Sequence, residues 1–172
     1  METNLMIKNE PNADELWAGI GGHFDSLGQI INEFIDNCIS NFVGNGTMTR
    51  NIVISLNELT NNGDVQVIIE DSGTGIKHLD EALTLGSCAA AESPLNEHGF
   101  GMKHALASAN PENNSWVIYT RTQSDIDEGK FKKIEAPYKI DNFTAKICTV
   151  EIWPGKLNGT GTIIKFVCKK EM

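Results

Sequence analysis

Glu33 and Asn37 are the first residues in the chain whose types and spacing could do chemistry. They lie four residues apart in the segment INEFIDNCISN, and residues with this spacing project side by side from a helix. A carboxylate can accept a proton from water, and an amide oxygen can coordinate a hard cation such as Mg²⁺ without adding charge. The pair is also typical of a solvated helix face, so taken alone it leaves both interpretations open.

Asp71 ends an apolar run in the segment EDSGTGI. An aspartate at the end of a buried strand is costly unless a donor satisfies it. An exocyclic amine such as that of adenine is a donor of this kind, and Gly73 and Gly75 would let the backbone approach a base closely. The alternative is a turn that simply closes the strand.

The segment HGFGMKHA combines glycines, a lysine and an expected helix start. Backbone N–H groups at a helix N-terminus together with the ammonium of Lys103 would make a local anion site. The spacing is that of neither a Walker A loop nor a dinucleotide-binding fingerprint, and glycines also cap helices. A further segment, NGTGT, opens the last expected strand and by itself indicates a hairpin turn.

The elements that must position these residues follow from hydrophobic periodicity. The period of 3.6 residues predicts one long helix over residues 24–43, which carries Glu33 and Asn37 opposite a wide apolar stripe. Shorter helical stretches are expected over residues 78–85 and 101–109, with a loop over residues 86–96 between them. Strands are expected over residues 51–59, 65–70, 115–122, 130–134, 145–153 and 160–168. This order predicts an α+β fold, a two-layer α/β sandwich with a mixed, mostly antiparallel sheet and helices on one face.

Length and charge limit the classes of function. The 172 residues form a single expected domain, residues 1–172, and the net charge is −9. An acidic surface repels nucleic acid and acidic membranes, so no direct nucleic-acid binding is expected, and any anion must be bound locally. The sequence shows no signal peptide, no membrane span and no Cys-x-x-Cys motif, so we expect a cytoplasmic protein with idle thiols.

In their order and spacing, the segments INEFIDNCISN, EDSGTGI, HGFGMKHA and GTGTIIKF resemble a known family. The chain is similar to the ATP-binding domain of the GHKL superfamily (gyrase, heat-shock chaperone, histidine kinase and mismatch repair), which has the Bergerat fold, also called the histidine-kinase-like ATPase fold. The matching segments extend over residues 29 to 166. The first and third segments are most similar to the microrchidia and chaperone-like branch.

The resemblance implies a role for each matching residue. Glu33 would be the general base that activates water, and Asn37 would bind a Mg²⁺ shared with the phosphates of ATP. Asp71 would bind the adenine amine, assisted by Thr162, in a base pocket shaped by the second segment. That segment supplies Gly73, Gly75 and Ile76. The phosphates would be held by the third segment, namely Gly99, Phe100, Gly101, Met102 and Lys103, and residues 86–98 would form an ATP lid.

The resemblance also implies what the domain does with ATP. The expected function is Mg²⁺-dependent ATP binding and hydrolysis, in which lid closure drives homodimerisation or engagement of a partner transducer domain. The alternatives are a protein kinase of the same fold, of the histidine or anti-sigma serine type, and an ATP-gated binding module with negligible turnover. Ser40 and Asn96 depart from the family pattern. ATPase relatives usually take a phosphate-sensing Lys or Arg from a following domain, so weak turnover is expected of this chain alone.

Overall fold

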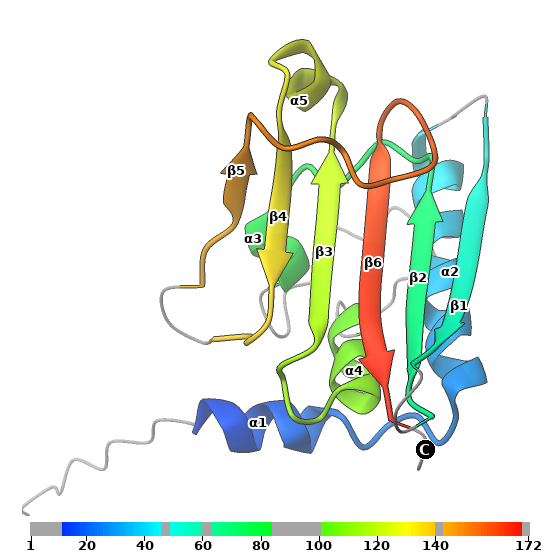
Figure 1. Ribbon diagram of the computed structural model, residues 1–172, viewed down its shortest axis with the longest axis vertical. Coiled ribbons are helices and arrows are strands. Elements are labelled where there is room, and N and C mark those ends of the chain that lie inside the picture. Colours follow the sequence, from blue (N-terminus) through cyan, green and yellow to red (C-terminus); the bar gives the residue numbers. More distant parts are fainter. Residues whose placement is uncertain (1–11, 46–48, 60–62, 84–100, 140–142, 170–172) are drawn as a thin grey trace, which may run out of the picture.

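Six strands form one open sheet in the order β1-β2-β6-β3-β4-β5 (Figure 1). The computed structural model describes residues 12–45, 49–59, 63–83, 101–139 and 143–169. The strands are β1 (Ile52–Glu58), β2 (Val65–Asp71), β3 (Trp116–Arg121), β4 (Phe131–Glu135), β5 (Lys146–Cys148) and β6 (Gly161–Cys168). β1 and β2 form a hairpin, while β6, the last strand in the chain, lies between β2 and β3.

Every pairing between the described strands is antiparallel, so the prediction of a mixed sheet is wrong. β2 and β3 do run parallel to each other, because both are antiparallel to β6. They are joined through helices, which is the connection that parallel strands need. Since β6 lies between them, β2 and β3 do not pair with each other directly.

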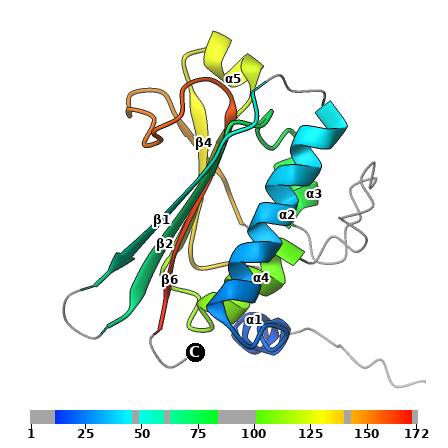
Figure 2. The same cartoon turned by 90° about the vertical axis from the view of Figure 1, so that its right-hand side faces the viewer.

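The described helices are α1 (Ala13–Ile20), α2 (Leu27–Asn45), α3 (Leu79–Leu83), α4 (Gly101–Ala109) and α5 (Gln123–Asp127). The first four cover one face of this sheet, which gives the two-layer α+β architecture that the sequence predicted. Figure 2 shows α1 to α4 on one side of the sheet. α5 lies beyond the ends of β3 and β4 (Figure 1).

The apolar stripe of α2 forms the centre of the core. Ile30, Phe34, Cys38 and Phe42 are all buried, at the helical spacing that the sequence indicated. The ring of Phe34 lies 5.4 Å from that of Phe166 on β6. Burial of an isoleucine or phenylalanine side chain such as these stabilises the fold by roughly 1.5–3 kcal/mol. The stripe thus sets the rotation of α2 and turns its polar flank toward the end of β2.

Two helices and one strand differ from the prediction. α1 and α5 were not expected; α1 is held by Trp17, whose Nε1 donates to the carbonyl of Asn110 at 2.8 Å. α5 begins at a capping box between Thr122 and Asp125. The strand expected over residues 145–153 is limited to β5, because the chain then leaves the sheet and Trp153 packs on Phe131, with ring centroids 5.6 Å apart.

No helix among the described residues is long and apolar enough to span a bilayer. Cys38, Cys148 and Cys168 are buried as reduced thiols. Trp17 and Trp116 are buried in the core.

Candidate functional site

Asp71 is a buried carboxylate at the end of a central strand. Its side chain is 9% exposed, and the register of β2 with β6 places it directly opposite Thr162. Its Oδ1 accepts the backbone N–H of Gly73 at 2.7 Å, and its Oδ2 accepts the thiol of Cys38 at 3.7 Å. Burial raises the pKa of Asp71 to about 6, while these hydrogen bonds oppose the rise. The carboxylate is therefore ionised at pH 7 and able to accept a further donor.

A pair of threonine hydroxyls lies beside Asp71 in the sheet. Thr120 on β3 is fully buried, and its Oγ1 lies 3.2 Å from Oγ1 of Thr162. The same oxygen accepts the backbone N–H of Ile76 at 2.8 Å. Thr120 thus ties the loop after β2 to β3 and β6. Thr162 and Ile76 were predicted from the sequence, but Thr120 was not. Its alternating position in β3 marks it only as an inward-facing polar residue.

The loop after β2 needs glycine at both predicted positions. Gly75 has a φ of 73°, and a Cβ there would overlap the backbone carbonyl of Arg121. A Cβ at Gly73 would overlap the side-chain oxygens of Asn41 and Asp71. The two glycines therefore let the loop fold closely against both β3 and α2.

The polar flank of α2 presents Glu33, Asn37 and Asn41 at intervals of one turn. Asn41 accepts the backbone N–H of Thr74 at 2.9 Å and donates to the Thr74 hydroxyl at 3.3 Å, which fixes the loop to the helix. Asn37 donates its amide to the carbonyl of Glu33 at 2.9 Å. The side-chain amide oxygen of Asn37 is the atom that could coordinate a hard cation. Asn41 was missed, although its spacing of four from Asn37 was a signal for it.

The other end of this flank meets the start of α4. A Cβ at Gly101 would overlap the carboxylate of Glu33, so glycine is what allows the two helices to approach here. Burial, and then the nearby charge of Asp36, raise the pKa of Glu33. Lys103, in the first turn of α4, is 1% exposed, and burial lowers its pKa to about 8. A carboxylate and an ammonium, both partly desolvated, therefore lie on neighbouring helices.

The structure thus brings the predicted residues together in two groups joined by α2. Asp71, Gly73, Gly75, Ile76 and Thr162 form the group at the end of β2. Glu33, Gly101 and Lys103 form the group at the start of α4, where Met102 is partly buried against the core. Gly99, Phe100 and the predicted lid over residues 86–98 lie outside the described residues.

Two charged residues that the sequence analysis missed hold the segment leading into β6. Glu70 is 3% exposed, and its carboxylate accepts the backbone N–H groups of Lys156 at 2.9 Å and Leu157 at 2.8 Å. From β3, Arg121 donates to the carbonyl of Gly159 and stacks over the ring of Trp153 at 4.1 Å. Glu70 and Arg121 are positioning residues, because this segment places Thr162 beside Asp71.

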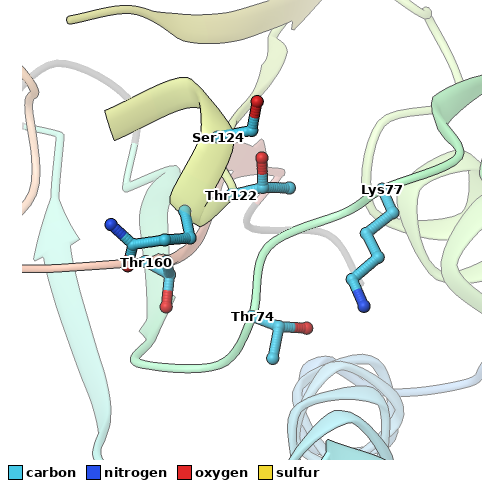
Figure 3. Close-up of a pocket in the computed structure, with 6 residues that line it drawn as sticks. Thr74, Lys77, Thr122, Ser124 and Thr160 are labelled. Carbon is cyan, nitrogen blue, oxygen red and sulfur yellow. The ribbon is translucent and has the colours of Figure 1, made fainter. Parts of the chain in front are cut away.

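A cavity of about 460 Å³ opens at the edge of the loop that follows β2 (Figure 3). Its lining is mostly hydroxyl groups with one ammonium: Thr74, Lys77, Thr122, Gln123, Ser124 and Thr160. Asp71, Asn37 and Lys103 are not part of that lining. The cavity adjoins the site through Thr74, which contacts Asn41, and it is a neighbouring feature rather than the site itself.

The described residues contain no group of three or more His, Cys, Asp or Glu side chains that could hold a metal. A cation here would therefore need ligands besides those side chains, and Asn37 is the side chain best placed to contribute one. The sequence matches no protein-family model and no curated protein.

Proposed function

We propose that this chain is an ATP-binding domain of the GHKL type, with the Bergerat fold, which binds ATP with Mg²⁺ and hydrolyses it. The observation that carries the proposal is the buried carboxylate of Asp71 at the end of β2, with two close-packed glycines after it. A buried charge is unfavourable in a purely structural position. Its position beside a closely packed glycine loop supports a ligand-binding role.

The adenine end of the ligand would lie at Asp71. An ionised carboxylate accepts an exocyclic amine in a charge-assisted hydrogen bond, which is stronger than a neutral one. The hydroxyl of Thr162, which lies 3.2 Å from that of the fully buried Thr120, would offer a further donor or acceptor beside it. Gly73 and Gly75 let the loop pack against α2 and β3, which would hold its backbone beside Asp71.

The phosphate end would lie toward the start of α4. Glu33 and Asn41 are separated by eight residues of α2, which is about 12 Å at 1.5 Å per residue. That span is comparable to a nucleoside triphosphate. Lys103 and the N-terminal N–H groups of α4 would hold the phosphates, in agreement with the family resemblance. This local site offsets the net charge of −9, which would otherwise repel the ligand.

The donor set fits Mg²⁺ that is shared with phosphates. Mg²⁺ is commonly bound through one or two protein oxygens together with substrate phosphates and water, and Asn37 would supply the protein oxygen. When bound, Mg²⁺ would neutralise charge on the phosphates. Glu33, on the same flank and one turn away, would hold and deprotonate the attacking water. ATP binding would then drive homodimerisation or contact with a transducer domain.

Isothermal titration of the chain with ATP, with and without Mg²⁺, tests the proposal. Asp71→Asn should weaken ATP binding by about 10- to 100-fold, because it removes a hydrogen bond to a charged acceptor. Asp25→Asn, an exposed aspartate outside the site, is the matched control. Equal ATP affinity in both variants, or no ATP binding by the unmodified chain, contradicts the proposal.

A further inference from the structure

The outer edge of β1 carries apolar side chains that the sheet leaves uncovered. β1 is the first strand of the sheet, and no described strand pairs with its other side. Ile54 and Leu56 lie opposite Ile69 and Val67 in the register of β1 with β2, so all four side chains point to the helix face. Ile69 and Val67 are 1% and 0% exposed, whereas Ile54 and Leu56 are 41% and 56% exposed.

The hydrogen bonds between β1 and β2 also determine which backbone groups of β1 point to this edge. Ser72 donates to the carbonyl of Asn51 at 3.0 Å, and Leu59 donates to that of Asp64 at 2.7 Å. Both pairs continue the β1–β2 register, so the odd-numbered residues of β1 are the ones that exchange hydrogen bonds with β2. The even-numbered residues therefore point their N–H and C=O groups to the free edge. These are Ile52, Ile54, Leu56 and Glu58.

We propose that a second copy of this chain pairs with this edge, antiparallel, about a two-fold axis at Ser55. In this register Ile54 of one copy lies opposite Leu56 of the other. The outward-pointing N–H and C=O groups of the even-numbered residues in one copy therefore face those of the even-numbered residues in the other. The pairing is self-complementary, as an isologous dimer requires. It joins two six-stranded sheets into one continuous sheet and removes an exposed apolar edge.

Charge at the two ends of β1 favours this arrangement. Arg50 lies two residues before the strand and Glu58 ends it, and both are exposed. Antiparallel pairing about Ser55 makes Arg50 of one copy a diagonal neighbour of Glu58 of the other, at both ends of the contact. The net charge of −9 opposes association of two copies, but at physiological ionic strength this repulsion is screened beyond about 8 Å.

The adjacent flank of α2 adds apolar surface at the same end of the molecule. Ile39 and Val43 are 39% and 61% exposed, and they lie on the side of α2 away from Asn37 and Asn41. Glu33, on the Asn37 side, faces α4, so the Ile39 side faces away from α4. Figure 1 shows α2 behind β1 and β2. A second copy seated on β1 would therefore lie close to apolar side chains from both layers.

The first test is the mass of the chain in solution, measured by analytical ultracentrifugation without nucleotide across a hundredfold concentration series. The expected result is a concentration-dependent species of twice the 18.8 kDa chain mass. A monomer at every concentration overturns the proposal that a second copy occupies this edge. Because no ATP is present, this outcome is independent of the proposed ATP-binding function.

A matched pair of double variants tests the register. I54K/L56K places lysine opposite lysine in both halves of the contact and should abolish the dimer. I54K/L56E places lysine opposite glutamate and should retain a dimer that weakens as salt is added. Circular dichroism checks that both variants fold. A dimer that survives in I54K/L56K lies elsewhere and overturns the proposal.

Cross-linking locates the two-fold axis. Ser55→Cys should form an intermolecular disulfide under mild oxidation, since opposed residues of a pair that does not exchange hydrogen bonds lie within disulfide reach. Val53→Cys alone should not cross-link, but Val53→Cys mixed with Asn57→Cys should. The unmodified chain measures the background from the native cysteines. Cross-linking of Val53→Cys alone at the rate of Ser55→Cys overturns this register.

Discussion

The thiol of Cys38 donates to the carboxylate of Asp71 across the boundary between the helical layer and the sheet, with Sγ and Oδ2 3.7 Å apart. Both side chains are buried. Burial, and then the charge of Asp71, raise the pKa of Cys38, so the thiol stays protonated and acts as a donor. From the sequence this cysteine was expected to be idle. The contact instead links the core stripe of α2 to the central carboxylate of the candidate site.

Asp71→Asn should stabilise the free protein above pH 6. Because the folded-state pKa of Asp71 is about 6, the folded chain keeps this proton to a higher pH than the unfolded chain, whose carboxyl titrates near 3.9. The contribution of Asp71 to stability is therefore full below about pH 4 and is lost as the pH rises through 6. The variant should exceed the wild type by about 1–3 kcal/mol at pH 7.5.

Urea unfolding at pH 4, 5 and 7.5 measures this difference. Asp25→Asn, an exposed position, should show no comparable pH-dependent gain. A difference between Asp71→Asn and the wild type that is the same at all three pH values contradicts the burial of a charge at Asp71.

Glu33→Ala and Glu33→Gln should retain ATP binding and lose ATP hydrolysis. Loss of a general base lowers turnover by about 100-fold or more. Since burial raises the pKa of Glu33, wild-type turnover should rise with pH as this carboxyl loses its proton. Release of phosphate from labelled ATP is the measurement, with the exposed Glu15→Gln as control.

The same assay separates the alternatives to an ATPase. Label transferred to protein supports a kinase of the same fold. Turnover at background in the wild type, with tight Mg²⁺-dependent binding, supports an ATP-gated binding module. Unchanged phosphate release by both Glu33 variants removes the assignment of Glu33 as the base.

Gly75→Ala should destabilise the fold much more than Gly129→Ala. Both glycines have positive φ, 73° and 66°, so an alanine at either costs about 1–2 kcal/mol of conformational strain. At Gly75 the new Cβ would also overlap the backbone carbonyl of Arg121, whereas Gly129 has nothing within 4 Å. Denaturant unfolding of the two variants isolates the close approach. Equal losses of stability show that the loop after β2 can move away from β3.

ATP binding should take up protons near pH 8.5 through Lys103. The pKa of this lysine is lowered to about 8 by burial, and adjacent phosphates would favour its charged form. Titration calorimetry in two buffers with different ionisation heats measures the uptake. Lys103→Met should remove the uptake and weaken binding, while the exposed Lys77→Met should leave the uptake unchanged. Uptake that persists in Lys103→Met assigns the proton to another group.

The hydrophobic pattern of the sequence predicted the individual helices and strands of the candidate site better than it predicted how they are arranged in the sheet. The helical stripe through Phe34 predicted α2, and alternation predicted the β1–β2 hairpin, because both depend on neighbours in the chain. The antiparallel insertion of β6 between β2 and β3 could not be read in this way. The order of strands in the sheet depends on which strands bury one another best. This order places residues as distant in sequence as Asp71 and Thr162 opposite each other.

The sequence by itself determined which residue types were available for chemistry, and it predicted Glu33, Asn37, Asp71 and Lys103 from motif order and spacing. Only the tertiary structure decided their environments. Burial set the protonation of Asp71 and Lys103, and contacts between distant segments revealed the parts played by Asn41, Thr120 and Glu70. Desolvation and hydrogen bonding depend on every neighbour in space, and the linear order of residues does not specify those neighbours.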